Sequence, residues 1–444
     1  MKYLKNLLII FIATMTLSQA TFATGGVFPY KVERVTLKNG FKAILIPISG
    51  SGLISYYSVV RTGSRDEWEP GKSGFAHFFE HMMFRGTERF PGNVYDSIVT
   101  SMGADANAYT SSDLTVYHLT AANDYLETII DIESDRFRNL RYTKEQFQTE
   151  SGAVYGEYRK GRTSPWSVAF EAFQDMAFDK HTYKHTTIGF EKDIIDMPNQ
   201  YDYSLSFYKR YYRPENVILV ISGDFDVDKA KAFIEKYYSP WEPGYVKPEI
   251  DPEPVQTAPR STKVTYDGKT LPLLMIGYKC DAFDVNNPDY LALDPFAEVA
   301  FGRTSDIYKK LVLEEQKVTF IQAGTQSSRD PFPFMIYTQV KKIEDMEYVQ
   351  AEIEKTIERF KTELIDKSML EILKKRDKYQ FLMQLDSPES VASILPQYIT
   401  LTGDIKVIDE YFANYDKITP EQIVKSVNKY FVESGKNLLI LTGN

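Results

Sequence analysis

Hydrophobic and polar residues alternate along the first part of the chain in the way typical of β-strands. The segment 32–48 alternates around Asn39-Gly40, a dipeptide favoured in tight turns, and therefore predicts a pair of strands joined by a turn. Further strands are predicted at 54–61, at 107–121, which is rich in Thr, Tyr and Val, and at the apolar run 217–222.

Elsewhere, apolar residues recur every three or four positions, which is the spacing of an amphipathic helix. Helices are predicted at 71–84, 94–102, 125–140 and 143–160. The last of these opens with Thr143 and, three residues on, Gln146, a pattern that caps a helix N-terminus. Strands and helices together predict an α+β fold.

A change of composition divides the chain. The segment 240–260 holds six prolines and shows little periodicity, as expected of an extended linker. Strands restart beyond it, so we predict one domain at 24–239 and a second at 261–444. Lys209-Arg210-Tyr211-Tyr212 before the apolar run 217–222 is similar to Asn428-Lys429-Tyr430-Phe431 before a second apolar run, which indicates an internal duplication.

The N-terminus has the pattern of a secretory signal peptide. Lys2 and Lys5 precede an apolar run at 7–17, and Ala20 and Ala23 both suit a cleavage site. The run is shorter than the roughly 20 residues that span a membrane, which favours a removed signal over the alternative of a permanent anchor. The mature protein is predicted to be periplasmic or extracellular, without stable membrane insertion.

Charge and cysteine content exclude several other classes. The 444 residues carry 52 basic and 61 acidic side chains and no basic block, which argues against nucleic acid as a partner. The hydrophobic content of 43% excludes a disordered chain. Cys280 is the only cysteine, so an intrachain disulfide cannot form.

The candidate chemistry lies in the sequence His77-Phe78-Phe79-Glu80-His81, within a predicted helix. Histidines four residues apart stand on one helical face, so both imidazoles can reach a single divalent ion, most plausibly zinc. Glu80 is near enough to polarise a metal-bound water and take its proton. The alternative is a pair of partly buried histidines on an aromatic helix.

A catalytic zinc site needs a third ligand from another element. Glu150 and Glu157 lie seven residues apart on one face of the helix predicted at 143–160, so one can bind metal while the other supports a ligand. Glutamates at this spacing otherwise form a solvated face. A rival pair, His181 and His185, has no carboxylate between its members and lies in loop-like sequence.

The order H-x-x-E-H, with a glutamate 76 residues after the second histidine, resembles the inverted-motif zinc peptidases of the pitrilysin and insulinase type. The segments 104–120, 207–224 and 305–315 are also similar to segments of that family. Chain length and the duplicated ending resemble its shorter branch, which includes the mitochondrial processing peptidase. The resemblance implies two homologous domains, each a mixed, largely antiparallel sheet packed with helices, and two chains that close around a chamber.

The resemblance also implies residue roles. It implies that one zinc ion per chain is bound by His77, His81 and Glu157. Glu80 would then be the general base and Glu150 would assist catalysis. Asn107 and Ala108 would lie on an edge strand that pairs with the backbone of a peptide substrate.

One segment departs from the family pattern. Active members use an Arg and, seven residues later, a Tyr that help to hold the substrate carbonyl, but the aligned residues here are Val312 and Thr319. Neither offers the guanidinium or phenol donor that an oxyanion needs. We therefore expect a heterodimer with a homologous chain that supplies both residues. The competing account is a shifted alignment in which another Tyr acts with Lys309 or Lys310.

The sequence as a whole predicts an exported zinc metalloendopeptidase that acts on peptides or unfolded segments with a partner subunit. The alternative from another class is a non-catalytic binding or assembly subunit of a processing-peptidase-like complex. A zinc hydrolase acting on another kind of substrate is disfavoured by the family resemblance alone.

Overall fold

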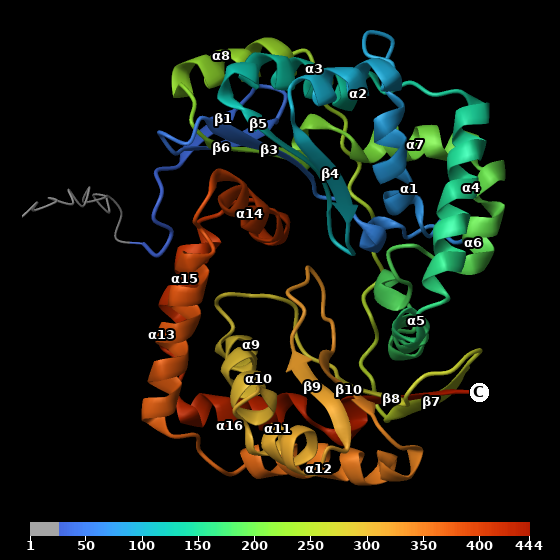
Figure 1. Cartoon of the computed structure of the whole chain (residues 1–444), viewed down its shortest axis with the longest axis vertical. Coiled ribbons are helices and arrows are strands. Elements are labelled where there is room, and N and C mark those ends of the chain that lie inside the picture. The colour runs from blue at the N-terminus through green and yellow to red at the C-terminus, as the bar shows by residue number, and fades with distance from the viewer. Residues whose placement is uncertain (1–25) are drawn as a thin grey trace, which may run out of the picture.

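The computed structural model describes residues 26–444 and contains two β-sheets, each packed with helices (Figure 1). The predicted signal peptide at 1–23 lies outside the described residues. Residues 239–259, between the two sheets in sequence, form neither helix nor strand. The α+β prediction is confirmed, while the domain limits 24–239 and 261–444 stay predictions.

The first sheet has six strands, and only its β2–β6 pairing is parallel. In spatial order the strands are β1 (Glu33–Thr36), β2 (Lys42–Pro47), β6 (Val217–Gly223), β3 (Leu53–Val60), β5 (Thr115–Ala122) and β4 (Asp105–Thr110). The turn between β1 and β2 places Gly40 at φ +89°, a backbone conformation that glycine adopts without a steric penalty. The strand pair predicted at 32–48 is therefore confirmed.

The segment 107–121 does not form one strand, as the sequence pattern had predicted, but turns back on itself between β4 and β5. The Ser111 N–H donates to the Leu114 carbonyl at 2.8 Å, and the Ser111 hydroxyl accepts from the Asp113 N–H at 3.3 Å. Polar side chains that bond to nearby backbone favour such turns over a continuous strand. As a result, β4 lies at the edge of the sheet with one side unpaired.

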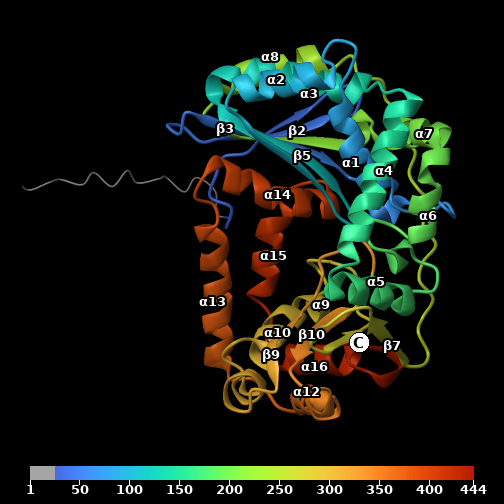
Figure 2. The same ribbon diagram turned by 45° about the vertical axis from the view of Figure 1, so that its right-hand side comes forward.

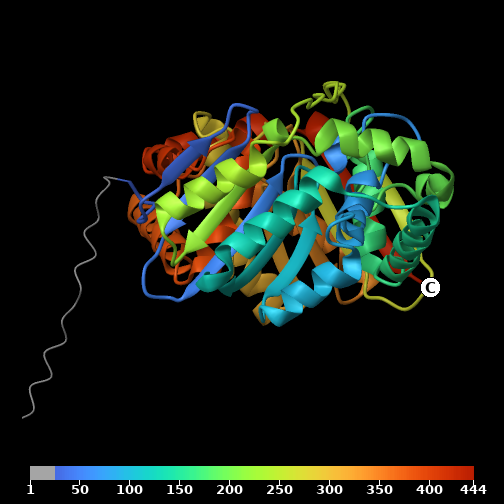
Figure 3. The same ribbon diagram turned by 90° about the horizontal axis from the view of Figure 1, so that it is seen from above.

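Helices cover both faces of the first sheet. Successive residues of a strand point to opposite faces, so alternate residues pack on opposite sides of the sheet. On β2, Ala43 and Leu45 pack into the core beneath α3 and α8, and Ile44 and Ile46 pack against α14. Seen from above, α3 and α8 cover the strands and run roughly along them (Figure 3). The helices that precede the linker are α1 (Phe75–Met82), α2 (Gly92–Ser101), α3 (Leu126–Asn139), α4 (Lys144–Gly161), α5 (Pro165–Ala177), α6 (Glu191–Asp196), α7 (Tyr201–Tyr211) and α8 (Val227–Tyr238).

The second sheet has five strands with one parallel pairing, between β7 and β11. In spatial order they are β7 (Arg260–Tyr266), β11 (Lys436–Gly443), β8 (Leu273–Tyr278), β10 (Phe334–Val340) and β9 (Val318–Gly324). The helices of this half are α9 (Pro288–Leu291), α10 (Leu293–Phe301), α11 (Asp306–Tyr308), α12 (Met346–Phe360), α13 (Lys367–Met383), α14 (Pro388–Thr402), α15 (Val407–Tyr415) and α16 (Pro420–Tyr430).

The two sheets share one topology. In each, the strand that follows a long helix, β6 after α7 and β11 after α16, inserts between a parallel and an antiparallel neighbour. The duplicated endings seen in the sequence are therefore equivalent elements of two similar folds.

Each half also contributes one helix that packs against the sheet of the other half. The helix α14 lies against β3 and β6 of the first sheet, and α5 lies against β7, β8 and β11 of the second. In Figure 2, α13 and α15 run between the two layers and carry the chain to α14 and back. No helix among residues 26–444 is long and apolar enough to cross a membrane.

Polar contacts of the β9–β10 loop also join the halves. Asp330 forms an ion pair with Arg65, and its carboxylate lies 3.0 Å from His181 Nε2. The neighbouring Arg329 N–H donates to Asp113 Oδ2 at 2.9 Å. These contacts tie the second sheet to the loops at the end of the first.

Candidate metal centre

The helix α1 presents its apolar residues to the core and its two histidines to the opposite side. Phe75, Phe78, Phe79 and Met82 are fully buried, while His77 and His81 keep partial exposure. The N-terminus of the helix has no side-chain cap from its own first residue. Instead, the buried Glu67 carboxylate accepts hydrogen bonds from the Gly74 and Ala76 N–H groups at 2.7 and 2.6 Å, which fixes where α1 begins.

The helix α4 packs beside α1 and brings a carboxylate to the histidines. It begins with the predicted capping box of Thr143 and Gln146. Glu157 Oε2 lies 3.4 Å from His77 Nε2 and 3.5 Å from His81 Nε2. One ligand atom from each of these three residues lies within 4.8 Å of the others. Two imidazole nitrogens and one carboxylate oxygen are a donor set that zinc accepts, so the residues present fit this ion.

The second glutamate of α4 meets His81 from the other side of the imidazole ring. Glu150 Oε1 lies 2.8 Å from His81 Nδ1, and Glu150 Oε2 pairs with Arg85. With the proton on Nδ1, His81 donates to Glu150 and leaves the Nε2 lone pair facing Glu157. Arg85 was not among the residues predicted from the sequence, although it stands four residues after His81, a spacing that places two residues on one face of a helix.

His77 is held neutral by its surroundings. Burial, with a smaller contribution from the neighbouring His81, lowers the pKa of His77 to about 4. A neutral imidazole is the form that binds metal. Its Nδ1 atom is buried and has no hydrogen-bond partner among the described residues.

Glu80 points into the same cavity as His77 and Glu157, a space of about 710 Å³. Its Oε2 atom accepts a hydrogen bond from the Thr110 hydroxyl at 2.6 Å. Burial raises the pKa of Glu80, and the bond from Thr110 offsets part of that rise. Thr110, at the end of β4, is a second polar contact that the sequence argument did not find.

The edge strand β4 runs beside this cavity. Ala108 and Thr110 line the cavity, and Asn107 lies next to Ala108 with its side chain exposed. The Asn107 amide oxygen accepts from the Ala108 N–H at 2.9 Å. Because β4 pairs with β5 alone, its other edge is free along the side of the histidines.

The remaining histidines lie elsewhere. His181 contacts Asp330, and His185 is buried with Nδ1 3.0 Å from the Thr186 carbonyl oxygen. The imidazole of His118 stacks on Tyr57 at 4.8 Å between ring centroids. None of the three joins the group formed by His77, His81 and Glu157.

Two similar α+β halves and a helix bearing H-x-x-E-H define the class of inverted-motif zinc peptidases. Residues 55–190 match the family described as Insulinase (Peptidase family M16), and residues 200–376 match the Peptidase M16 inactive domain. The chain belongs to this M16 family, the insulinase or pitrilysin family of zinc proteases.

Particular relatives agree with this family. The chain is 28% identical to the zinc protease PqqE of Helicobacter pylori over 418 residues, which is 93% of each protein. It is 27% identical to the β subunit of the mitochondrial processing peptidase of Caenorhabditis elegans over 58% of this chain and 55% of that one. A crystal structure of a protease from Helicobacter pylori superposes with a TM-score of 0.87 at 27% identity, covering 93% of this chain and 99% of the other.

Proposed function

We propose that this chain is an exported zinc-dependent endopeptidase that hydrolyses peptides or unfolded segments and depends on a homologous partner chain. The observation that carries the proposal is the convergence of His77, His81 and Glu157 beside the half-buried carboxylate of Glu80, at a free sheet edge. The similarity to a zinc protease along nearly the whole chain supports peptide bonds as the target.

One zinc ion would be held by His77, His81 and Glu157. Bound there, it would supply a Lewis acid that polarises the carbonyl of the bond to be cut and makes a water more acidic. Glu150 keeps His81 in the tautomer that presents Nε2, and the ion pair with Arg85 keeps Glu150 in place.

Glu80 acts as the general base. The Thr110 hydroxyl holds Oε2, so Oε1 is left to accept a proton from the attacking water and to pass it to the leaving amine. The raised pKa of Glu80 makes its carboxylate a stronger base than an exposed glutamate.

The free edge of β4 orients the substrate. An extended peptide can pair with the backbone at Asn107 and Ala108 as an added strand, which places one of its bonds beside Glu80. A folded protein rarely presents a free strand, so this requirement favours short peptides and unfolded segments.

The need for a partner is inferred from the second half, which has Val312 and Thr319 where an Arg and a Tyr are expected. Val312 lies against the apolar core, and Thr319 on β9 donates to Gln339 at 3.3 Å. The Lys310 ammonium, which the competing account would use, pairs with Glu352 at 2.8 Å. Loss of one oxyanion donor costs about 3 kcal/mol, or roughly a hundredfold in rate, so a chain without both donors would be badly impaired.

Zinc content and cleavage of a quenched fluorescent peptide test the site. We expect Glu80→Gln to retain one zinc per chain and to lose at least about a hundredfold in turnover, because an amide cannot accept the proton. The matched control is Glu145→Gln, an exposed position on α4. Retained turnover in Glu80→Gln would remove this residue from the role of base.

Assays of the mature chain, alone and with a homologous chain lacking H-x-x-E-H, test the partner. Activation that disappears when the Arg and Tyr of the added chain are substituted is the expected result. Full activity of the isolated chain, unchanged by the addition, would refute the need for a partner.

The second candidate function is a non-catalytic binding or assembly subunit. Val312 and Thr319 favour it, because neither side chain stabilises an oxyanion. Bound zinc without turnover, even with the partner chain present, would decide for this function.

Export is proposed from the sequence of residues 1–23. Identification of the N-terminal residue of the protein purified from its own source tests whether this segment is removed.

A further inference from the structure

Four aromatic side chains form a cluster outside the metal centre. Trp166 and Phe170 of α5, Phe320 of β9 and Tyr337 of β10 make up what we call the aromatic shelf. The Trp166 ring lies 5.8 Å from Phe320 and 5.7 Å from Tyr337, and the Phe170 ring lies 5.9 Å from Tyr337. Phe170 is 36% exposed and the other three are half-buried, so the shelf keeps apolar surface open to solvent.

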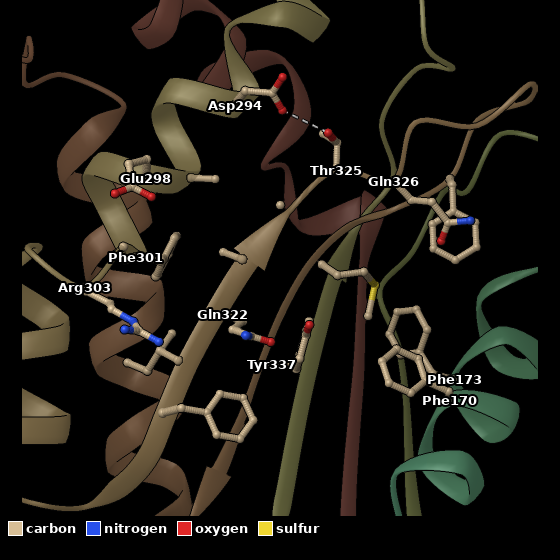
Figure 4. Close-up of a pocket in the computed structure, with 18 of the residues that line it drawn as sticks. Phe170, Phe173, Asp294, Glu298, Phe301, Arg303, Gln322, Thr325, Gln326 and Tyr337 are labelled. Atoms are coloured by element: carbon tan, nitrogen blue, oxygen red, sulfur yellow. Dashed lines mark hydrogen bonds between the residues drawn. The ribbon is translucent and has the colours of Figure 1, made fainter. Parts of the chain in front are cut away.

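Phe170, Phe320 and Tyr337 of the shelf line a cavity of about 1090 Å³ that extends along the edge strand β9 between α5 and α10 (Figure 4). Trp166 lines a smaller hollow that shares Phe170 with this cavity. The acidic groups at the far side already have partners. Asp294 accepts from Thr325 at 3.2 Å and from Tyr411 at 2.8 Å, and Glu298 pairs with Arg376 at 2.8 Å. The Arg303 guanidinium and the Gln322 amide also line the cavity, and the shelf supplies its aromatic surface. Acidic groups that are already paired, an arginine and aromatic rings together favour an apolar occupant over a cation.

This cavity adjoins the space around the candidate metal centre. Thr187 lines the space around His77 and Glu80, the hollow beside Trp166, and the large cavity. In addition, α5 starts at Pro165, directly after α4 ends at Gly161, so the shelf is tied to the helix that carries Glu157. A peptide held at the candidate metal centre would therefore have the shelf within reach on the side bordered by Thr187.

We propose that the aromatic shelf binds an aromatic side chain of the substrate, some residues away from the bond cut at the metal centre. This inference rests on the proposed peptidase function. Aromatic rings suit the shelf because ring pairs at these separations gain about three- to tenfold in affinity beyond the effect of buried area. The shelf would thereby select substrates by sequence, while pairing with β4 is indifferent to sequence.

Binding measurements on the inactive Glu80→Gln chain test the proposal without cleavage. Labelled unstructured peptides that carry one Phe, moved along the peptide in a series, are compared by fluorescence anisotropy with a peptide in which Gln replaces that Phe. We expect about tenfold tighter binding for Phe at one or two positions. The variant Phe170→Ser with Tyr337→Thr should reduce this preference to about twofold or less.

Two controls keep the result interpretable. Tyr379→Ser removes an aromatic ring that is 64% exposed on α13, outside the shelf, and should leave the preference unchanged. If the double variant does not fold, Phe170→Ser alone, at an exposed position, takes its place in the test. It should lower the ratio of the two dissociation constants, Gln peptide over Phe peptide, from about tenfold to about threefold.

Two results would contradict the proposed binding of an aromatic side chain at the shelf. One is equal binding of the Phe and Gln peptides at every position, and the other is a preference for Phe that the shelf variants leave unchanged. Because the assay needs no turnover, it separates the two proposals. An unmutated chain that shows the preference but never cleaves, with zinc and partner present, would contradict the peptidase function and still support the shelf as a binding site.

Discussion

Glu150 and Glu157 share one face of α4 but approach the candidate metal centre differently. Glu157 lies near Nε2 of both His77 and His81, whereas Glu150 touches only Nδ1 of His81 and is paired with Arg85. A carboxylate already bound to an arginine is poorly available as a ligand, so the geometry favours Glu157 for the metal and Glu150 for orientation.

Zinc affinity should follow this difference. We expect Glu157→Gln to weaken zinc binding by more than about a hundredfold and Glu150→Gln by about tenfold, as is typical of a residue that only orients a ligand. Competition with a chromophoric chelator measures both, with Glu145→Gln as the control. The reverse order would show that the two roles are exchanged.

At the scale of elements, the start of α1 depends on a residue outside the helix. Gly74 has φ +93°, and an added Cβ there would lie 2.6 Å from the Ile188 carbonyl oxygen. The N–H groups that a side-chain cap would normally bind are satisfied by Glu67. Glu67 thus positions the helix that carries both histidines.

Replacement of Glu67 should therefore affect both stability and metal binding. Glu67→Gln places an NH₂ group against an N–H donor, and we expect a loss of about 2 kcal/mol in the free energy of unfolding. Zinc affinity should fall as well, because α1 loses its fixed starting point. Denaturant unfolding and chelator competition measure the two effects, and Glu88→Gln, an exposed position, is the control. Unchanged values would show that the backbone alone holds α1.

The sequence predicted the elements that follow local rules and missed those set by distant contacts. The α4 capping box and the strand pair around Asn39-Gly40 depend on neighbouring residues, so their patterns were sufficient. The histidine spacing likewise predicted a shared helical face. The position of Arg85, four residues after His81, offered a local signal, but its pairing with Glu150 depends on the packing of α1 against α4. Thr110 reaches Glu80 only through the packing of α1 against β4, which no local pattern encodes.

Larger departures from the sequence prediction have the same cause. Helix α5 packs on the second sheet and α14 on the first. Hydrophobic periodicity predicts that each helix has an apolar face, but it does not predict which sheet covers that face. Trp166 and Phe320 of the aromatic shelf lie on different sides of the predicted linker. Only the folded chain brings them together.

At the scale of the whole molecule, Asp330 connects the halves through Arg65 and His181. Burial alone would raise the pKa of Asp330, but hydrogen bonds from His181 and Arg65 outweigh it and hold the pKa well below its usual value. A carboxylate with a depressed pKa in the folded state contributes stability above its unfolded pKa, about 3.9. That contribution is lost as the pH falls through the folded value.

Asp330→Asn should lower the free energy of unfolding by about 1 to 3 kcal/mol at pH 7. The difference in unfolding free energy between the variant and the unmutated chain should begin to narrow below about pH 4, where Asp330 takes up a proton in the unfolded chain but stays ionised in the folded one. It should disappear as the pH falls through the lowered pKa of the folded state. Thermal unfolding across pH measures it. The control is Asp404→Asn, which breaks an exposed pair with Arg34 that also joins the halves and should change little. A gap that does not depend on pH would contradict the ionic explanation.

The exchange of helices also sets how the chain can be divided. A cut within residues 239–259 would leave the first fragment without α14 and the second without α5, so each would expose an apolar sheet face that only the other fragment covers. Neither fragment is then a self-sufficient unit. Produced together, the two pieces should reassemble by complementation, because each supplies the helix that covers the other's sheet.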